Sequence, residues 1–268
     1  MEEIRILSPT AILGYGFPRE SFQRGLKRNP HVIAVDGGST DPGPYYLGAG
    51  VSFTDRDAVK RDLAFMLKAG REKNIPVIVG SAGGSGGDEH LEWCLNIVYE
   101  IAREEKLHFK LAAISAQMDK AYLKEELKKG NISPLGPCQD LTREDVEVTT
   151  AIVAQMGVEP FKQALANGAE VIIAGRAYDP AVFAALPILK GFDPGLSLHL
   201  GKILECAAIA AVPGSGSDCM FGTLGKDYFT VEPLNPKRKC TITSVAAHTL
   251  YEKANPYLLP GPGGLLDL

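Results

Sequence analysis

Short apolar runs alternate along this chain with longer segments in which apolar residues recur at helical spacing. Five of the runs are rich in Val and Ile: residues 4–7, 31–35, 76–79, 109–114 and 170–174. Uninterrupted runs of this kind are typical of strands in a sheet covered on both faces. In between, residues 55–73 repeat apolar positions about every 3.6 residues, as an amphipathic helix does. The pattern predicts an α/β fold, with a mainly parallel, doubly wound sheet and helices on both faces.

Capping residues and helical spacing predict where the helices lie. The predicted ranges are 19–28, 55–73, 88–106, 119–129, 142–156, 160–167, 180–188 and 197–211. After Pro213 the pattern changes, and Thr- and Val-rich pieces at 228–231 and 240–245 predict short extended segments in a less regular C-terminal region.

This change of pattern suggests a division of the chain. We expect an α/β domain with glycine-rich ligand loops over residues 1–212. Residues 213–268 would form an irregular extension, either the start of a further domain or a partner interface. The glycine-rich end, 261–268, looks like a connector, which suggests a fragment or a subunit that depends on another polypeptide.

Charge, cysteine spacing and the length of the apolar runs argue against several classes of protein. The 268 residues carry a formal net charge of −4, which does not favour binding to nucleic acid or to an anionic membrane surface. The five cysteines are scattered and form no Cys-x-x-Cys pair, and no apolar run approaches a membrane span. The N-terminus has no signal-peptide pattern, so we expect a cytoplasmic protein.

Glycine and small polar residues follow three of the predicted strands directly. The segments are 36–44, 80–89 and 175–180. In an open parallel sheet, ligands bind at the carboxyl ends of the strands, where the strand order reverses. We therefore expect the three segments to converge on one site for a small, polar, anionic molecule.

The glycine run suits an anion because residues without a Cβ let backbone N–H groups approach a ligand closely. A strand-to-helix turn without a ligand is the alternative. The expected substrate-binding residues are Ser39, Thr40, Gly80, Ser81, Gly83, Gly84, Arg176 and Asp179. The Arg176 guanidinium would pair with a carboxylate or phosphate, while Asp179 alternatively caps the following helix.

Three residues are candidates for proton transfer: Asp36, Asp41 and His90. Asp36 ends a strand, and His90 lies in the first turn of the helix after the glycine run. Turn formation would also explain Asp41. No His or Glu cluster accompanies the aspartates, so we expect no metal site, and the sequence indicates no particular cofactor.

Two later segments, 204–206 and 217–219, pair a carboxylate with a cysteine. Glu205 lies in a very apolar segment, where a carboxylate needs a partner or a raised pKa. We regard Glu205 and Asp218 as secondary candidates for a site.

Three segments together resemble the acyclic terpene utilisation (AtuA-type) family: 32–48, with Asp-Gly-Gly-Ser-Thr-Asp-Pro-Gly-Pro, then 80–84 and 173–179. The resemblance covers most of the chain, as the amino-terminal domain of that family. It implies a role in the breakdown of branched isoprenoid acids, and it supports the three-loop site.

The leading hypothesis from the sequence is an enzyme of carboxylate or acyl-CoA catabolism. A lyase or hydratase is favoured, acting on a small or branched carboxylate or its CoA ester, because fixed donors suit proton abstraction next to a carbonyl. The alternative is a non-catalytic anion-binding subunit completed by a second chain. A partner subunit or a homo-oligomer is compatible with both hypotheses.

Overall fold

The computed structural model describes residues 2–38, 42–251 and 255–268. Its strands are β1 (Ile4–Ser8), β2 (Val32–Asp36), β3 (Val77–Gly80), β4 (Leu111–Ile114), β5 (Val171–Ala174), β6 (Met220–Leu224), β7 (Phe229–Pro233), β8 (Leu258–Gly261) and β9 (Gly264–Asp267). Its helices are α1 (Arg19–Lys27), α2 (Tyr45–Ala49), α3 (Arg56–Lys73), α4 (Asp88–Glu104), α5 (Lys120–Lys128), α6 (Arg143–Val148), α7 (Glu159–Ala166), α8 (Ala181–Leu189), α9 (Pro194–Leu204) and α10 (Ile242–Leu250), and η1 (Ala207–Ala210) is a short 3₁₀ helix.

Seven strands form the main sheet, in the order β4-β5-β3-β2-β1-β6-β7. The first five of these are mutually parallel, while β6 and β7 add to β1 as an antiparallel extension. The predicted mixed α/β fold with a mainly parallel sheet is therefore confirmed. A second, two-stranded sheet is the hairpin of β8 and β9.

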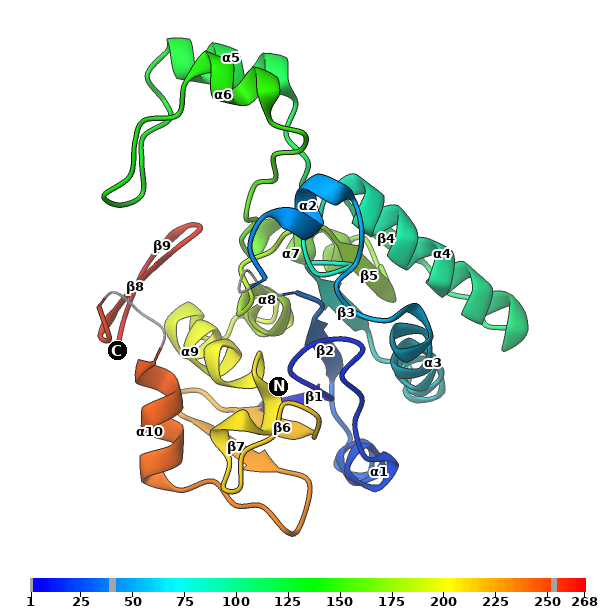
Figure 1. The fold of residues 1–268 in the computed structure, drawn as a ribbon. Coiled ribbons are helices and arrows are strands. Elements are labelled where there is room, and N and C mark those ends of the chain that lie inside the picture. Colours follow the sequence, from blue (N-terminus) through cyan, green and yellow to red (C-terminus); the bar gives the residue numbers. More distant parts are fainter. Residues whose placement is uncertain (1, 39–41, 252–254) are drawn as a thin grey trace.

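Helices cover both faces of the sheet because side chains alternate along each strand and both sets are apolar (Figure 1). Ile33 and Val35 on β2 pack with α1, α3 and α4. Val32 and Ala34 on the same strand pack with α7, α8 and α9. Within the described ranges, no helix has the length and apolar character needed to cross a membrane.

The direction of winding changes between β3 and β5, which are neighbours in the sheet. The chain leaves β3 for α4 on one face, whereas it leaves β5 for α8 on the other. This is the topological switch point of the sheet, the place where open α/β folds bind ligands. The segments 80–87 and 175–180 both begin there.

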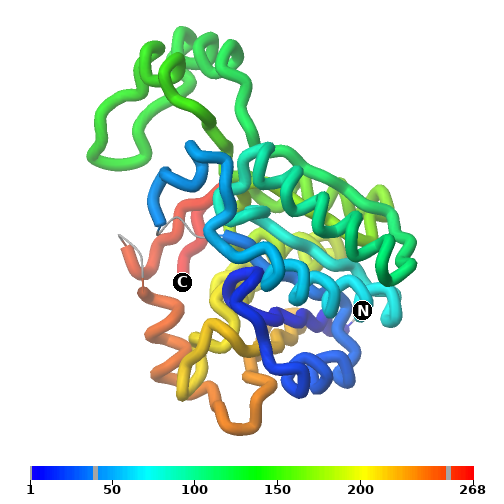
Figure 2. Tube along the Cα trace, turned by 45° about the vertical axis from the view of Figure 1, so that its right-hand side comes forward, coloured from blue at the N-terminus to red at the C-terminus, as the bar shows by residue number. Residues whose placement is uncertain are grey.

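An arm, residues 119–151, stands apart from the two helical layers. It contains α5 and α6, and it is drawn in green, clear of the rest of the chain, in Figures 1 and 2. Its two ends run side by side, with Met118 N–H donating to Ile152 O at 2.8 Å and Ala154 N–H donating to Ala116 O at 2.8 Å.

Some elements differ from the sequence prediction. The helix expected over 142–156 ends at Val148, and β6 was not predicted. The extended segment expected at 240–245 is wrong, since α10 begins at Ile242. Thr241 and Ser244 form a capping box at its start, and packing against α9 and η1 outweighs the strand propensity of the sequence.

Candidate functional site at the carboxyl edge of the sheet

Hydrogen bonds join the segments that follow β2, β3 and β5 into one unit. Gly37 N–H donates to Gly80 O at 2.8 Å, and Ser81 N–H donates to Gly175 O at 3.0 Å. Ser81 Oγ in turn accepts from Ala177 N–H at 3.3 Å. The described parts of the three segments that the sequence singled out therefore lie together at the carboxyl edge of the sheet.

The run 80–87 is buried along its whole length. Gly38 lies so close to it that a β-carbon at Gly38 would be 2.1 Å from Gly84 O. Ser81, Gly83, Gly84 and Gly86 all have positive φ, so the loop is tightly wound. The N–H groups of residues 83, 85 and 87 donate to no acceptor among the described residues. Free N–H groups in such a loop are the usual donors to a bound anion.

Asp36, the last residue of β2, is 2% exposed. Its Oδ2 accepts from Gly38 N–H at 3.2 Å, but no described residue hydrogen bonds to its buried Oδ1. Burial raises the pKa of Asp36 well above its usual value, and the negative charge of Asp179 raises it further against the opposing effect of Arg176. The protonated form of this carboxyl is therefore favoured relative to that of an exposed aspartate.

Arg176 lies next to this carboxyl, two residues beyond the end of β5. The residue is 8% exposed, and its Nη2 donates to Gly84 O. No ion pair of the guanidinium with a described carboxylate is found at salt-bridge distance. Asp179 interacts electrostatically with Asp36. The predicted capping role of Asp179 is wrong, because the N-cap of α8 is Pro180 and no side chain caps it.

A buried ion pair at the end of α9 adds two more charges to this neighbourhood. Lys202 pairs with Glu205, which is 5% exposed and acts electrostatically on Asp36. Burial works to lower the pKa of Lys202, but the charge of Glu205 and its hydrogen bond outweigh burial and raise it. The sequence pointed to Glu205 through its apolar surroundings, but it did not point to Lys202. The only signal was the three-residue spacing of the two side chains on one helix.

His90, in the first turn of α4, lies beside Gly83 and is 1% exposed. Its Nε2 is 3.0 Å from both Tyr46 O and Val51 O, so this nitrogen carries the proton as a donor. Nδ1 is then the basic nitrogen, and it has no hydrogen-bond partner among the described residues. His90 lines a small cavity of about 60 Å³ together with Gln117, Asp88 and Thr150.

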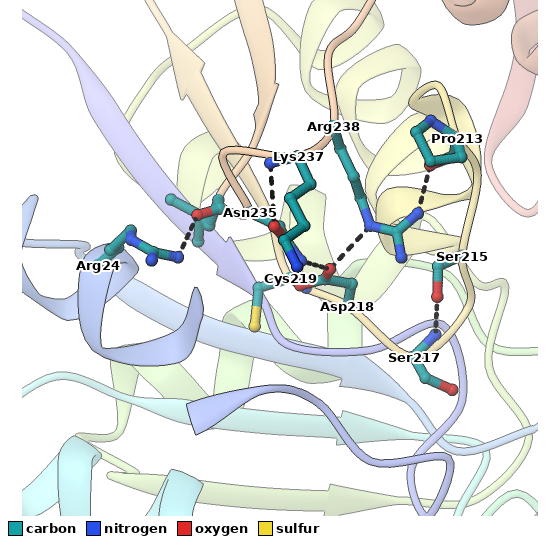
Figure 3. A network of polar contacts seen from close by, with 10 residues as sticks. Arg24, Pro213, Ser215, Ser217, Asp218, Cys219, Asn235, Lys237 and Arg238 are labelled. Atoms are coloured by element: carbon teal, nitrogen blue, oxygen red, sulfur yellow. Dashed lines mark hydrogen bonds and ion pairs between the residues drawn. The ribbon is translucent and has the colours of Figure 1, made fainter. Parts of the chain in front are cut away.

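Asp218 belongs to a different part of the protein (Figure 3). Its Oδ2 accepts from Arg238 Nε at 2.8 Å and from Asn235 Nδ2 at 2.7 Å. Burial works to raise the pKa of Asp218, but these hydrogen bonds outweigh it and lower the pKa. Burial, with a further contribution from Asp218, also raises the pKa of the Cys219 thiol well above its usual value, so Cys219 is a poor nucleophile. Asp218 therefore stabilises the 213–238 region through its hydrogen bonds to Asn235 and Arg238.

Three predicted site residues, Ser39, Thr40 and Asp41, lie outside the described residues. Among the residues that are described, no group of three or more His, Cys, Asp or Glu side chains could hold a metal ion. Gly80, Ser81, Gly83, Gly84, Arg176 and Asp179 all come from the two segments at the switch point.

Comparison with known proteins gives one match. The sequence profile of the acyclic terpene utilisation family protein AtuA matches residues 55–214. The chain belongs to this family. The match includes the glycine run, Arg176, the arm and the Lys202–Glu205 pair, whereas the Asp36 segment precedes it. Searches of curated proteins and of solved structures gave no significant match.

Proposed function

We propose that this AtuA-family protein is an enzyme of carboxylate or acyl-CoA catabolism that moves a proton next to a carbonyl group. A lyase or a hydratase acting on a small or branched carboxylate, or on its CoA ester, fits this chemistry. The observation that carries the proposal is the proximity, at the switch point, of buried Arg176 and buried Asp36, whose pKa is raised by burial and by the charge of Asp179.

Each group has a distinct task in this proposal. The Arg176 guanidinium and the free N–H groups of the glycine run would hold the anionic group of the substrate. Asp36 would deliver its proton to the oxygen or carbon on which charge develops. His90 Nδ1, which has no hydrogen-bond partner among the described residues, would act as the base through a water molecule in its cavity.

Exchange of substrate protons for deuterium tests whether the protein catalyses proton transfer. The protein is incubated in D₂O with a panel of small carboxylates and short acyl-CoA esters, and deuterium at the carbon next to the carbonyl is followed by NMR. We expect exchange with at least one compound, and loss of exchange in Asp36→Asn and His90→Gln. Binding without any exchange would instead favour a non-catalytic anion-binding subunit, and absence of both would overturn the proposal.

A further inference from the structure

We propose that two copies of this chain associate through the outer edge of β4, and that each copy places its arm on the surface of the other. This inference does not depend on the proposed function. It rests on three features at one end of the sheet: an open strand edge, an exposed arm and a basic hollow.

β4 is the last strand of the sheet, and no described strand pairs with its outer edge. The carbonyls of Lys110 and Ile114 bond to residues at the two ends of β5, so the intervening Leu111 and Ala113 direct their backbone groups outward. Ala113 is also exposed. An open edge can pair antiparallel with a second copy of itself about a two-fold axis, which satisfies the same groups on both chains.

The arm that follows β4 exposes several of its large apolar side chains. Leu135 is 96% exposed and Val148 is 75% exposed. Within the arm only Leu123 and Val146 are buried. Large apolar side chains exposed to this degree are found at sites of protein contact, and the arm has about the number of residues that one side of a standard interface uses.

The hollow lies where α4 ends and the chain turns toward β4. It has a volume of about 670 Å³ and is lined by Asn96, Tyr99, Ala102, Arg103, Lys106, Leu107 and His108. The positively charged side chains of Arg103 and Lys106 line the hollow together with Tyr99, which is half-exposed. The arm carries exposed Asp140 and Glu144, for which no ion pair is found among the described residues. Asp140 and Glu144 of the arm are therefore opposite in charge to Arg103 and Lys106 of the hollow.

The direction of β4 places the arm of one copy beside the hollow of the other copy, and not beside the hollow of its own chain. In an antiparallel β4–β4 pair, the end of one strand lies beside the start of the other. The arm leaves at the end of β4, while Leu107 and His108 of the hollow directly precede its start. Each arm would thus lie over the hollow of the other copy, which is why a second copy fits better than an unrelated protein.

Sedimentation velocity of the whole chain tests the pairing. We expect a species of about twice 28.7 kDa, and dissociation to a monomer in Ala113→Pro, which removes an outward N–H without touching the bonds to β5. Ala113→Thr, which keeps this N–H, is the matched control and should remain dimeric. Circular dichroism and urea unfolding establish that each variant is folded.

Charge exchange tests the arm. Lys106→Glu with Arg103→Glu should weaken the dimer at least tenfold, and adding Asp140→Lys with Glu144→Lys should restore it. A monomeric wild-type protein would overturn the proposal. So would a dimer that resists both Ala113→Pro and Leu135→Asp, or a larger assembly that only a different polypeptide can complete.

Discussion

Gly86 and Arg176 are in direct backbone contact across the switch point. Arg176 N–H donates to Gly86 O at 3.0 Å, and a β-carbon at Gly86 would be 2.1 Å from the Arg176 nitrogen. The two segments that leave β3 and β5 for opposite faces are therefore joined where they diverge. This contact holds the backbone of Arg176 in place, and it therefore sets the point from which the guanidinium side chain extends.

Gly86→Ala should unfold the protein at clearly lower urea concentration. The new side chain would clash with backbone, and Gly86 has a φ of +72°. The two effects together should cost about 3 kcal/mol or more. Gly130→Ala is the matched control, since its φ is +74° and nothing lies within 4 Å of an added β-carbon. It should cost only about 1 kcal/mol, and equal losses in the two variants would contradict the contact.

Arg176→Ala should weaken binding of carboxylate or phosphate ligands by about 2–5 kcal/mol, because a buried, bidentate, charge-assisted pair is lost. Arg176→Lys should be intermediate, since it keeps the charge but not the planar fork. Calorimetric titration with the compounds of the exchange panel measures both. Arg143→Ala, an exposed arginine on the arm, should bind as the wild type does. Unchanged affinity in Arg176→Ala would remove Arg176 from the site.

We expect the contribution of Asp36 to the free energy of unfolding to decrease as the pH rises. Its pKa is higher in the folded chain than in the unfolded chain, where it is about 4, so the folded state holds the extra proton above that pH. The free energy of unfolding should therefore fall from about pH 4 upward until the folded pKa is passed. Asp36→Asn should remove this part of the pH dependence, as measured by urea unfolding between pH 4 and 8. The same slope in both proteins would show that the pKa of Asp36 is not raised in the folded state.

Asp218→Ala should destabilise the protein by about 3 kcal/mol, because Arg238 and Asn235 lose a buried acceptor. The lowered pKa of Asp218 adds a pH signature of the opposite sign to that of Asp36. Its contribution is present above the unfolded pKa and is lost as the pH falls through the folded value. Asp227→Ala, at an exposed position, is the control and should change stability little. Thermal unfolding at two pH values measures both.

Much of the framework could be predicted from local sequence. Val32–Asp36 and Val171–Ala174 are strands because Val and Ile favour extended backbone and need cover on both faces. Segments of polar residues and glycine at their ends cannot continue a buried strand, which is why Asp36 and Arg176 could be singled out. The same local rules failed for α10, whose Thr and Val residues also suit a strand.

The sequence by itself determined the α/β alternation, the parallel strands and the loops at their carboxyl ends. Only the tertiary structure decided that β5 lies between β3 and β4, which makes the β3–β5 boundary the switch point. It likewise decided that Glu205 acts on the pKa of Asp36, and that the arm stands free. Strand propensity acts over a few residues, whereas strand order and pKa depend on groups that are far apart in the chain, and their proximity arises only when the whole core packs.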